Sequence, residues 1–324
     1  MSRHLRLFAL SLFSLCCFSS QSALAKTITV DADNAINLSS PFTREDCDGT
    51  AAKPTATTLS AALAMAQERD TILICPGTYA EEVLVTTSHL LISGLRGQGN
   101  TIDAILDGES TRHVGISIAS DVETVTIQNI AIENYLDAAI KAVQGPTYHV
   151  LIQDAAFHNN ANGVIAGDET SPVGTFTHTY FRVRRSLFTT NSAAGTAIAF
   201  TNCRNCRIQR NDIDGGDIGI ILRAQNSSDP SLTNNRLLLN TVTHAASVGI
   251  LLESLQNTTL KSPTLQRNTV TDTPSGVGIR LFAHDNAAIR GGKVVQSTIT
   301  PANPGIEVLT ATGGVVEKVK FADN

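Results

Sequence analysis

The sequence predicts an all-β solenoid, a parallel β-helix built from short strands and capped by an α-helix at its N-terminal end. Three observations predict this fold. A degenerate unit recurs at intervals of 25 to 31 residues, a polar residue keeps its place in successive units, and a short amphipathic segment comes directly before the repeats.

The repeat consists of an apolar anchor and, seven to ten positions later, an aliphatic residue directly preceded by a small one. In the unit around Ile213, a turn rich in Asp and Gly separates the anchor from Gly219-Ile220. Similar units at variable spacing are typical of solenoid coils that carry insertions in their turns. The anchors are Ile132, Phe157, Phe188, Ile213, Val242, Val270 and Ile299.

Polar residues occupy a fixed place before the anchors. Asn211, Asn240 and Asn268 each stand two positions before an anchor. Stacked side-chain amides can satisfy the backbone groups of turns, so we expect a buried asparagine ladder. Strand alternation also predicts that Ile220 and Leu222, with their equivalents in later coils, point into an apolar core.

The first 25 residues have the organisation of a secretory signal peptide, so we expect a mature β-helix domain over residues 26–324. Arg3 and Arg6 form a basic region, an apolar run follows, and Ala23-Leu24-Ala25 is a small-x-small cleavage site. Without the two arginines the formal net charge changes from −5 to −7, which argues against a nucleic-acid partner. No later stretch is apolar enough to span a membrane. We expect a secreted or periplasmic monomer.

Residues 57–68 have apolar side chains at helical spacing, and we expect this helix to cover the open apolar end of the solenoid. Residues 70–81 then read Asp-Thr-Ile-x-x-x-Pro-Gly-Thr-Tyr-x-Glu, and residues 91–94 read Leu-Ile-Ser-Gly. This opening resembles that of the pectate-lyase and pectin-esterase superfamily, and the later coils resemble the generic repeat of that superfamily. The resemblance covers residues 57–321 and implies a single-stranded right-handed parallel β-helix.

The resemblance implies no individual activity, because the motifs of the separate enzyme families are missing. The chain has neither the Trp-Ile-Asp-His stretch of pectate lyases nor the Asp-Phe-Ile-Phe-Gly stretch of pectin esterases, and it contains no Trp. Without Trp and with few aromatic residues, a groove that stacks successive sugars is also disfavoured.

In superfamily members that act on polysaccharides, the substrate lies along the outside of one sheet. Outward residues of the strands after the Gly-Ile step are therefore candidates. Arg223, Glu253 and Arg280 are the candidate catalytic residues, because β-elimination at a uronic acid needs a cation for the carboxylate and a base for the C5 proton. The alternative is a solvated surface with ion pairs between coils. The candidate substrate-binding residues of this face are Lys141, Phe282 and Glu307.

Three carboxylates, Asp212, Asp214 and Asp217, surround the turn of the Ile213 coil and are candidate calcium ligands. Carboxylates at such a place can also act as acid and base in hydrolases. His158 and His244 lie near the same turn of their own coils. The alternative is that Asp and Gly are simply the residues that turns require.

Four cysteines follow the expected signal peptide. We expect Cys47 and Cys75 to form a disulfide that ties the N-terminal loop to the first coil. Cys203 and Cys206 have C-x-x-C spacing, for which we expect a local disulfide. A redox pair and half of a zinc site are the alternatives.

Three functional hypotheses follow. The first is a secreted enzyme that acts on polysaccharide, namely a lyase or epimerase on uronic-acid glycans. The second is a non-catalytic solenoid that binds carbohydrate or a cell surface. The third is a periplasmic scaffold for maturation or export. A fold alone does not distinguish them.

Overall fold

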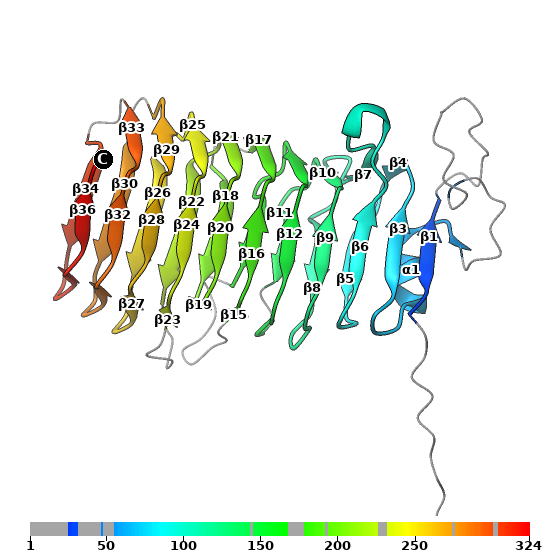
Figure 1. Cartoon of the computed structure of the whole chain (residues 1–324), viewed down its shortest axis with the longest axis horizontal. Helices are drawn as coiled ribbons and strands as arrows, with labels where there is room; N and C mark the ends of the chain where they lie inside the picture. The colour runs from blue at the N-terminus through cyan, green and yellow to red at the C-terminus, as the bar shows by residue number, and fades with distance from the viewer. Residues whose placement is uncertain are drawn as a thin grey trace, which may run out of the picture.

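The structure is a computed structural model that describes residues 25–31, 47, 55–142, 145–167, 178–191, 194–225, 232–273, 276–300 and 304–324. These residues form one right-handed parallel β-solenoid, which confirms the predicted fold (Figure 1). All of the predicted signal peptide except Ala25 lies outside the described residues. No helix in the described part of the chain is long and apolar enough to cross a membrane.

Each regular coil passes through three long parallel sheets, which we name A, B and C in the order in which the chain visits them. Sheet A holds β2 (Thr55–Ala56), β1 (Thr27–Val30), β3 (Thr71–Ile74), β6 (Leu91–Gly94), β9 (Thr126–Gln128), β12 (Leu151–Gln153), β16 (Arg182–Arg184), β20 (Arg207–Gln209), β24 (Arg236–Leu238), β28 (Thr264–Gln266), β32 (Lys293–Val295) and β36 (Lys320–Ala322).

Sheet B holds β4 (Gly77–Tyr79), β7 (Ala104–Asp107), β10 (Ala131–Glu133), β13 (Ala156–His158), β17 (Leu187–Asn191), β21 (Asp212–Gly215), β25 (Thr241–Thr243), β29 (Thr269–Thr271) and β33 (Thr298–Thr300). Sheet C holds β5 (Val83–Val85), β8 (Val114–Ile118), β11 (Ala138–Ala142), β14 (Val164–Ala166), β18 (Thr196–Thr201), β22 (Ile218–Ala224), β26 (Val248–Ser254), β30 (Val277–Ala283) and β34 (Ile306–Thr310).

Short strands add two small sheets where later coils return from sheet C to sheet A. One pairs β15 (His178–Thr179) with β19 (Cys203–Arg204). The other holds β23 (Leu232–Thr233), β27 (Thr259–Lys261), β31 (Ala288–Arg290) and β35 (Val315–Glu317). A 3-10 turn, η1 (Gln98–Asn100), lies between β6 and β7.

The predicted helix is α1 (Leu59–Met65), at the N-terminal end of the solenoid (Figure 1). Thr58 caps it by accepting a hydrogen bond from the Ala61 N–H at 3.1 Å. The carboxylate of Glu81 accepts from the N–H groups of Leu59 and Ser60 at 2.7 and 3.0 Å. Leu59 and Leu63 are part of the hydrophobic core. Glu81, the last residue of the 70–81 motif, therefore holds the N-terminus of the capping helix on the solenoid.

The apolar anchors form one inward row in sheet B. Ile132, Phe157, Phe188 and Ile213 are register partners on consecutive strands, and the rings of Phe157 and Phe188 stack at 4.5 Å. At about 2 kcal/mol for each buried aliphatic side chain, such rows dominate the stability. Sheet C has a corresponding inward row, formed by Leu222, Leu252, Leu281 and Val308. It ends in β34, the last strand of the sheet, where Val308 is 47% exposed because a neighbouring strand covers it on one side only.

The asparagine ladder is present and buried. The amide of Asn211 donates to Oδ1 of Asn240 at 3.0 Å, and the amide of Asn240 donates to Oδ1 of Asn268 at 3.0 Å. Each Oδ1 also accepts from the backbone N–H of the preceding ladder residue. Ser186 and Ser297 extend the ladder on either side. The ladder therefore satisfies a buried turn in each coil, as the sequence predicted.

The Gly-Ile corner requires glycine because the coils approach closely. A Cβ on Gly219 would lie 2.4 Å from Cγ1 of Val242 and 2.6 Å from the carbonyl oxygen of Gly249. No side chain fits there without moving a neighbouring coil.

Candidate functional site

The outer face of sheet C brings five of the six candidate catalytic and substrate-binding residues together. Arg223, Glu253 and Phe282 are register partners on β22, β26 and β30. Arg280 on β30 pairs in register with Glu307 on β34, in the adjacent row. Strands of one sheet lie about 4.8 Å apart, so these side chains are close neighbours.

The sixth candidate, Lys141, lies away from this group. It lies on β11 in the same register row as Arg280, five strands before β30. Its ammonium group lies 2.5 Å from the carboxylate of Asp137, on the same coil. Lys141 is therefore not a neighbour of the Arg280 group.

The arginines and glutamates of this face pair with each other. Arg223 Nε lies 2.5 Å from Glu253 Oε2, and these side chains are only 12% and 11% exposed. Arg280 Nε lies 2.5 Å from Glu307 Oε2, with exposures of 31% and 25%. Each guanidinium that we expected to hold a substrate carboxylate already holds a glutamate from the next coil.

An apolar strip underlies these pairs. Ile221 and Leu251, which strand alternation places on the outer face, are buried in a separate cluster with Val248 and Val277. Phe282 packs against this cluster and lies 4.7 Å from the ring of His284. The face therefore combines a buried apolar strip with the ion pairs between coils that the alternative expects, and of these pairs Arg223–Glu253 is largely desolvated.

The structure does not bring Asp212, Asp214 and Asp217 together as calcium ligands. Oδ1 of Asp214 lies 2.5 Å from Nδ1 of His244, and Asp217 accepts a hydrogen bond from the hydroxyl of Ser247. In the part of the chain that is described, no three His, Cys, Asp or Glu side chains converge as a metal site. Asp212 and Asp214 lie on β21, whereas Asp217 lies in the turn between β21 and β22. This turn separates Asp217 from the other two carboxylates.

The Asp214–His244 pair is an exposed contact between two coils. The hydrogen bond and charge of Asp214 raise the pKa of His244, and His244 lowers the pKa of Asp214. His158 has a different neighbour, since its Nδ1 lies 2.6 Å from the hydroxyl of Thr189. The two histidines do not share a site.

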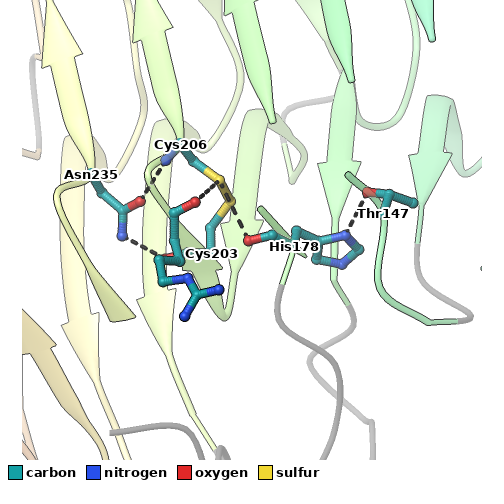
Figure 2. The surroundings of a disulfide bond; sticks show 6 residues. Thr147, His178, Cys203, Cys206 and Asn235 are labelled. Atoms are coloured by element: carbon teal, nitrogen blue, oxygen red, sulfur yellow. Dashed lines mark hydrogen bonds between the residues drawn. A yellow bond between two sulfur atoms is a disulfide. The ribbon is translucent and has the colours of Figure 1, made fainter. Parts of the chain in front are cut away.

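Both expected disulfides are present. Cys47 bonds Cys75, and Cys203 bonds Cys206. Figure 2 shows the second bond beside Asn235, whose Oδ1 accepts from the Cys206 N–H at 2.9 Å and whose amide donates to the Cys203 carbonyl at 2.7 Å. Both cysteines are buried, so the local disulfide is structural and the redox and zinc alternatives are not supported.

His178 lies near this disulfide and is buried. Its Nδ1 is 2.9 Å from the hydroxyl of Thr147 (Figure 2). Its ring also meets the ring of Phe181 edge-on. Burial lowers the pKa of His178 to about 4, so the imidazole is neutral at pH 7.

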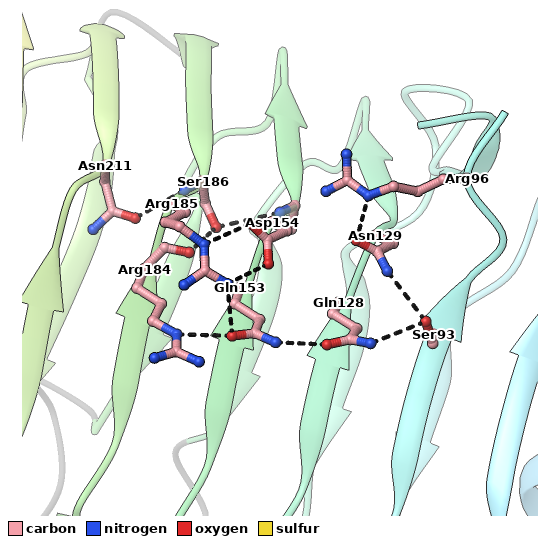
Figure 3. A network of polar contacts seen from close by, with 11 residues as sticks. Ser93, Arg96, Gln128, Asn129, Gln153, Asp154, Arg184, Arg185, Ser186 and Asn211 are labelled. Atoms are coloured by element: carbon pink, nitrogen blue, oxygen red, sulfur yellow. Dashed lines mark hydrogen bonds and ion pairs between the residues drawn. The ribbon is translucent and has the colours of Figure 1, made fainter. Parts of the chain in front are cut away.

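A polar network on the outer face of sheet A was not predicted. Gln153 links two neighbours, because its amide donates to Gln128 at 2.6 Å and its carbonyl accepts from Arg184 at 2.7 Å (Figure 3). Arg185 makes a two-point contact with Asp154, at 2.8 and 2.6 Å. The Asp154–Arg185 hydrogen bond lowers the pKa of Asp154.

Three further arginines, Arg182, Arg207 and Arg236, occupy one row of the same face. They are register partners on the adjacent strands β16, β20 and β24. Each stands four residues before a ladder residue, namely Ser186, Asn211 or Asn240. Aligning the coils on the ladder would have found this row, but the variable length of the coils hides it from a direct search for repeats. We name it the arginine row.

The comparisons with known proteins agree with this architecture. A family model described as a right handed beta helix region matches residues 112–294, and no curated protein sequence matches the chain. The chain is similar to the structure of pectate lyase Pel9A, with a TM-score of 0.57 and 13% identity, over 91% of this chain and 78% of that chain. DFA-IIIase from Arthrobacter chlorophenolicus A6 in complex with GF2 gives a TM-score of 0.41 and 12% identity, over 78% and 82% of the two chains. The likeness to Pel9A shows a shared fold and does not establish an activity.

Proposed function

Because the chain belongs to the right-handed β-helix family, we propose that it binds polysaccharide on the outer face of sheet C without cleaving it. The observation that carries the proposal is the register of Phe282 beside the Arg280–Glu307 pair, over the apolar strip. A sugar ring presents an apolar face and a rim of hydroxyl groups. It therefore fits a surface that offers an aromatic ring next to planar polar groups.

The pairing of the candidate catalytic residues favours binding over elimination. A general base must reach the C5 proton, whereas Glu253 is held by Arg223 and is 11% exposed. Arg280 is likewise held by Glu307, so a uronate carboxylate would have to displace that glutamate. Lyase chemistry therefore stays a prediction that the same experiment tests, and epimerase chemistry, which forms no unsaturated product, stays a prediction.

Export to the periplasm or the medium is part of the proposal. The signal peptide that the sequence predicts over residues 1–25 supports it, and two disulfides are typical of an oxidising compartment. A pectate lyase with the same fold supports polysaccharide as the ligand class, by analogy of fold alone.

The test is binding of the purified chain to polygalacturonate, alginate and a neutral xylan by affinity electrophoresis, with the absorbance of an unsaturated uronate product followed in parallel. We expect binding to at least one glycan and no product. Phe282→Ala should weaken binding about tenfold, through the loss of aromatic contact. Arg280→Ala should weaken it in the same direction.

Arg290→Ala is the matched control, because Arg290 also pairs with a glutamate of the next coil, Glu317, at 2.9 Å, but on another sheet. Binding that is absent, or unchanged in Phe282→Ala and Arg280→Ala, contradicts the proposal. An unsaturated product that disappears in Arg280→Ala would replace it with the lyase hypothesis.

A further inference from the structure

We propose that Arg182, Arg207 and Arg236 form a second binding site, on the outer face of sheet A, for an acidic glycan that carries carboxylate groups at intervals along its chain. The site lies on a different sheet from Phe282 and Arg280, so the inference does not rest on the proposed function.

The three guanidinium groups are stacked by the backbone. Arg182 pairs in register with Arg207, and Arg207 with Arg236, with a buried residue following each of them in its strand. All three side chains therefore project from the same outer face, about 4.8 Å apart from strand to strand. Like charges at this spacing repel each other, and a stable solenoid has no need of them.

The surroundings leave this charge unneutralised. In register with the row, the flanking strands carry Leu151 on one side and Thr264 on the other, neither of which is acidic. The nearby Arg184 and Arg185 differ, because Gln153 and Asp154 hold them. Among the described residues, no carboxylate forms an ion pair with any member of the arginine row.

Arg207, at the centre of the arginine row, also has a side-chain nitrogen without a hydrogen-bond partner. Its Nε is buried and has no hydrogen-bond partner within the described residues. Partial burial, followed by the charges of Arg236 and Arg182, lowers the pKa of Arg207. A buried N–H donor without a partner is costly, and a rotation of the Arg207 side chain that turns its guanidinium toward a bound anion would remove that cost.

A hollow of about 250 Å³ opens beside these arginines. Besides the three arginines and Cys206 it is lined by Tyr180, Asn205 and Asn234, at the turns that lead into the three strands. The ring of Tyr180 stacks on His149 at 4.7 Å. Amide groups and a fixed aromatic ring beside a cationic row suit a sugar chain better than an isolated ion, because they offer contacts to hydroxyl groups and to an apolar ring face.

Carboxylates on a chain and free inorganic oxyanions share the chemistry that a guanidinium fork recognises. A polymer differs from a free ion because it can place successive charges on successive arginines. A nucleic acid would also present repeated charges, but the chain has a formal net charge of −5, which opposes a long polyanion outside this row. We therefore favour a short acidic oligosaccharide as the ligand.

The test is calorimetric titration of the full chain with an oligogalacturonate, with inorganic sulfate, with a neutral xylo-oligosaccharide and with single-stranded DNA, at low and at physiological salt. We expect binding of the oligogalacturonate that weakens with salt. Arg207→Gln should reduce the affinity about tenfold or more, since hydrogen bonds to charged groups are the strong ones. Arg182→Gln and Arg236→Gln should each also reduce the affinity for the oligogalacturonate.

Lys293→Gln is the matched control. Lys293 belongs to the same row of sheet A, two strands beyond Arg236, and its substitution removes the same charge. The proposal is overturned if Lys293→Gln and Arg207→Gln weaken binding equally, if the oligogalacturonate does not bind, or if sulfate binds as tightly as the oligomer. Tighter binding of DNA through the same arginines would overturn the ligand class.

The outcome is separable from that of the proposed function. Phe282→Ala should leave oligogalacturonate binding at the arginine row unchanged, and Arg207→Gln should leave glycan binding on sheet C unchanged. Thermal unfolding shows whether Arg207→Gln loses binding because it is less well folded. The midpoint of its unfolding transition should be no lower than that of the unsubstituted chain.

Discussion

The asparagine ladder and the arginine row share two coils, in which Arg207 and Arg236 stand four residues before Asn211 and Asn240, but the two kinds of side chain behave differently when they are stacked. An amide carries donors and an acceptor, so Asn211, Asn240 and Asn268 satisfy each other when stacked. A guanidinium carries a positive charge and only donors, so Arg182, Arg207 and Arg236 repel each other and cannot hydrogen-bond to each other when stacked. Stacked amides hydrogen-bond to each other and therefore stabilise the solenoid. Stacked guanidinium groups cannot do so, and an anionic ligand would satisfy their donors and neutralise their charge.

The largest expected effect comes from breaking the ladder. Asn240→Ala removes the acceptor of the Asn211 N–H and one donor to the Ile208 carbonyl, and it leaves the buried Asn211 N–H without its acceptor. We expect a loss of about 3 kcal/mol in the free energy of unfolding, measured by urea denaturation. Gln266→Ala is the control, because among the described residues its amide donates only to the exposed Gln296. A loss in Asn240→Ala as small as that of the control would mean that the ladder is not a stabilising element.

The second prediction concerns His178, which precedes Arg182 by four residues and is buried. Its pKa is about 4 in the folded chain and near 6.5 when unfolded. The unfolded state therefore takes up a proton first as the pH falls. Stability is complete above about pH 6.5 and decreases towards pH 4. This group alone should lower the free energy of unfolding by about 2 kcal/mol between about pH 7.5 and about pH 5.

Urea denaturation at several pH values measures this effect. His178→Asn removes the titrating group, so its stability should change less with pH than that of the unsubstituted chain. Equal pH dependence in both chains would show that His178 is not responsible.

The third prediction contrasts a paired arginine with the arginine row. Asp154→Asn removes the carboxylate that Arg185 holds at two points. We expect a loss of about 1 kcal/mol that shrinks in high salt, because the pair is partly exposed. A double-mutant cycle with Arg185→Gln measures the pair directly. A coupling energy of zero at low salt would contradict the expectation.

The smallest expected effect has the opposite sign. Arg207→Gln relieves repulsion within the arginine row, so the free energy of unfolding should rise by about 0.5 kcal/mol at low salt and less at high salt. The same substitution should weaken oligogalacturonate binding. Together the two results would show that the arginine row lowers the free energy of unfolding and raises the affinity for the ligand. A clear loss of stability would instead assign Arg207 a structural role.

The sequence by itself determined the fold, the inward rows and the asparagine ladder. Ile213, Val242 and Asn240 repeat because every coil must bury the same positions, and such a pattern survives changes in turn length. It also predicted both disulfides and placed Arg223, Glu253 and Phe282 in one outward row, since side chains alternate along a strand.

Only the tertiary structure decided which outward groups meet and what each of them holds. Arg207 follows Arg182 by 25 residues and precedes Arg236 by 29, so only the hydrogen-bonded register of the strands places the three in line. The same register closes the Arg223–Glu253 pair over an apolar strip, and the turn after β21 separates Asp217 from Asp212 and Asp214. Inward positions must satisfy the core in every coil, whereas outward positions are free to vary. Contacts between outward side chains therefore depend on insertion lengths and turn geometry, which a repeat pattern does not encode.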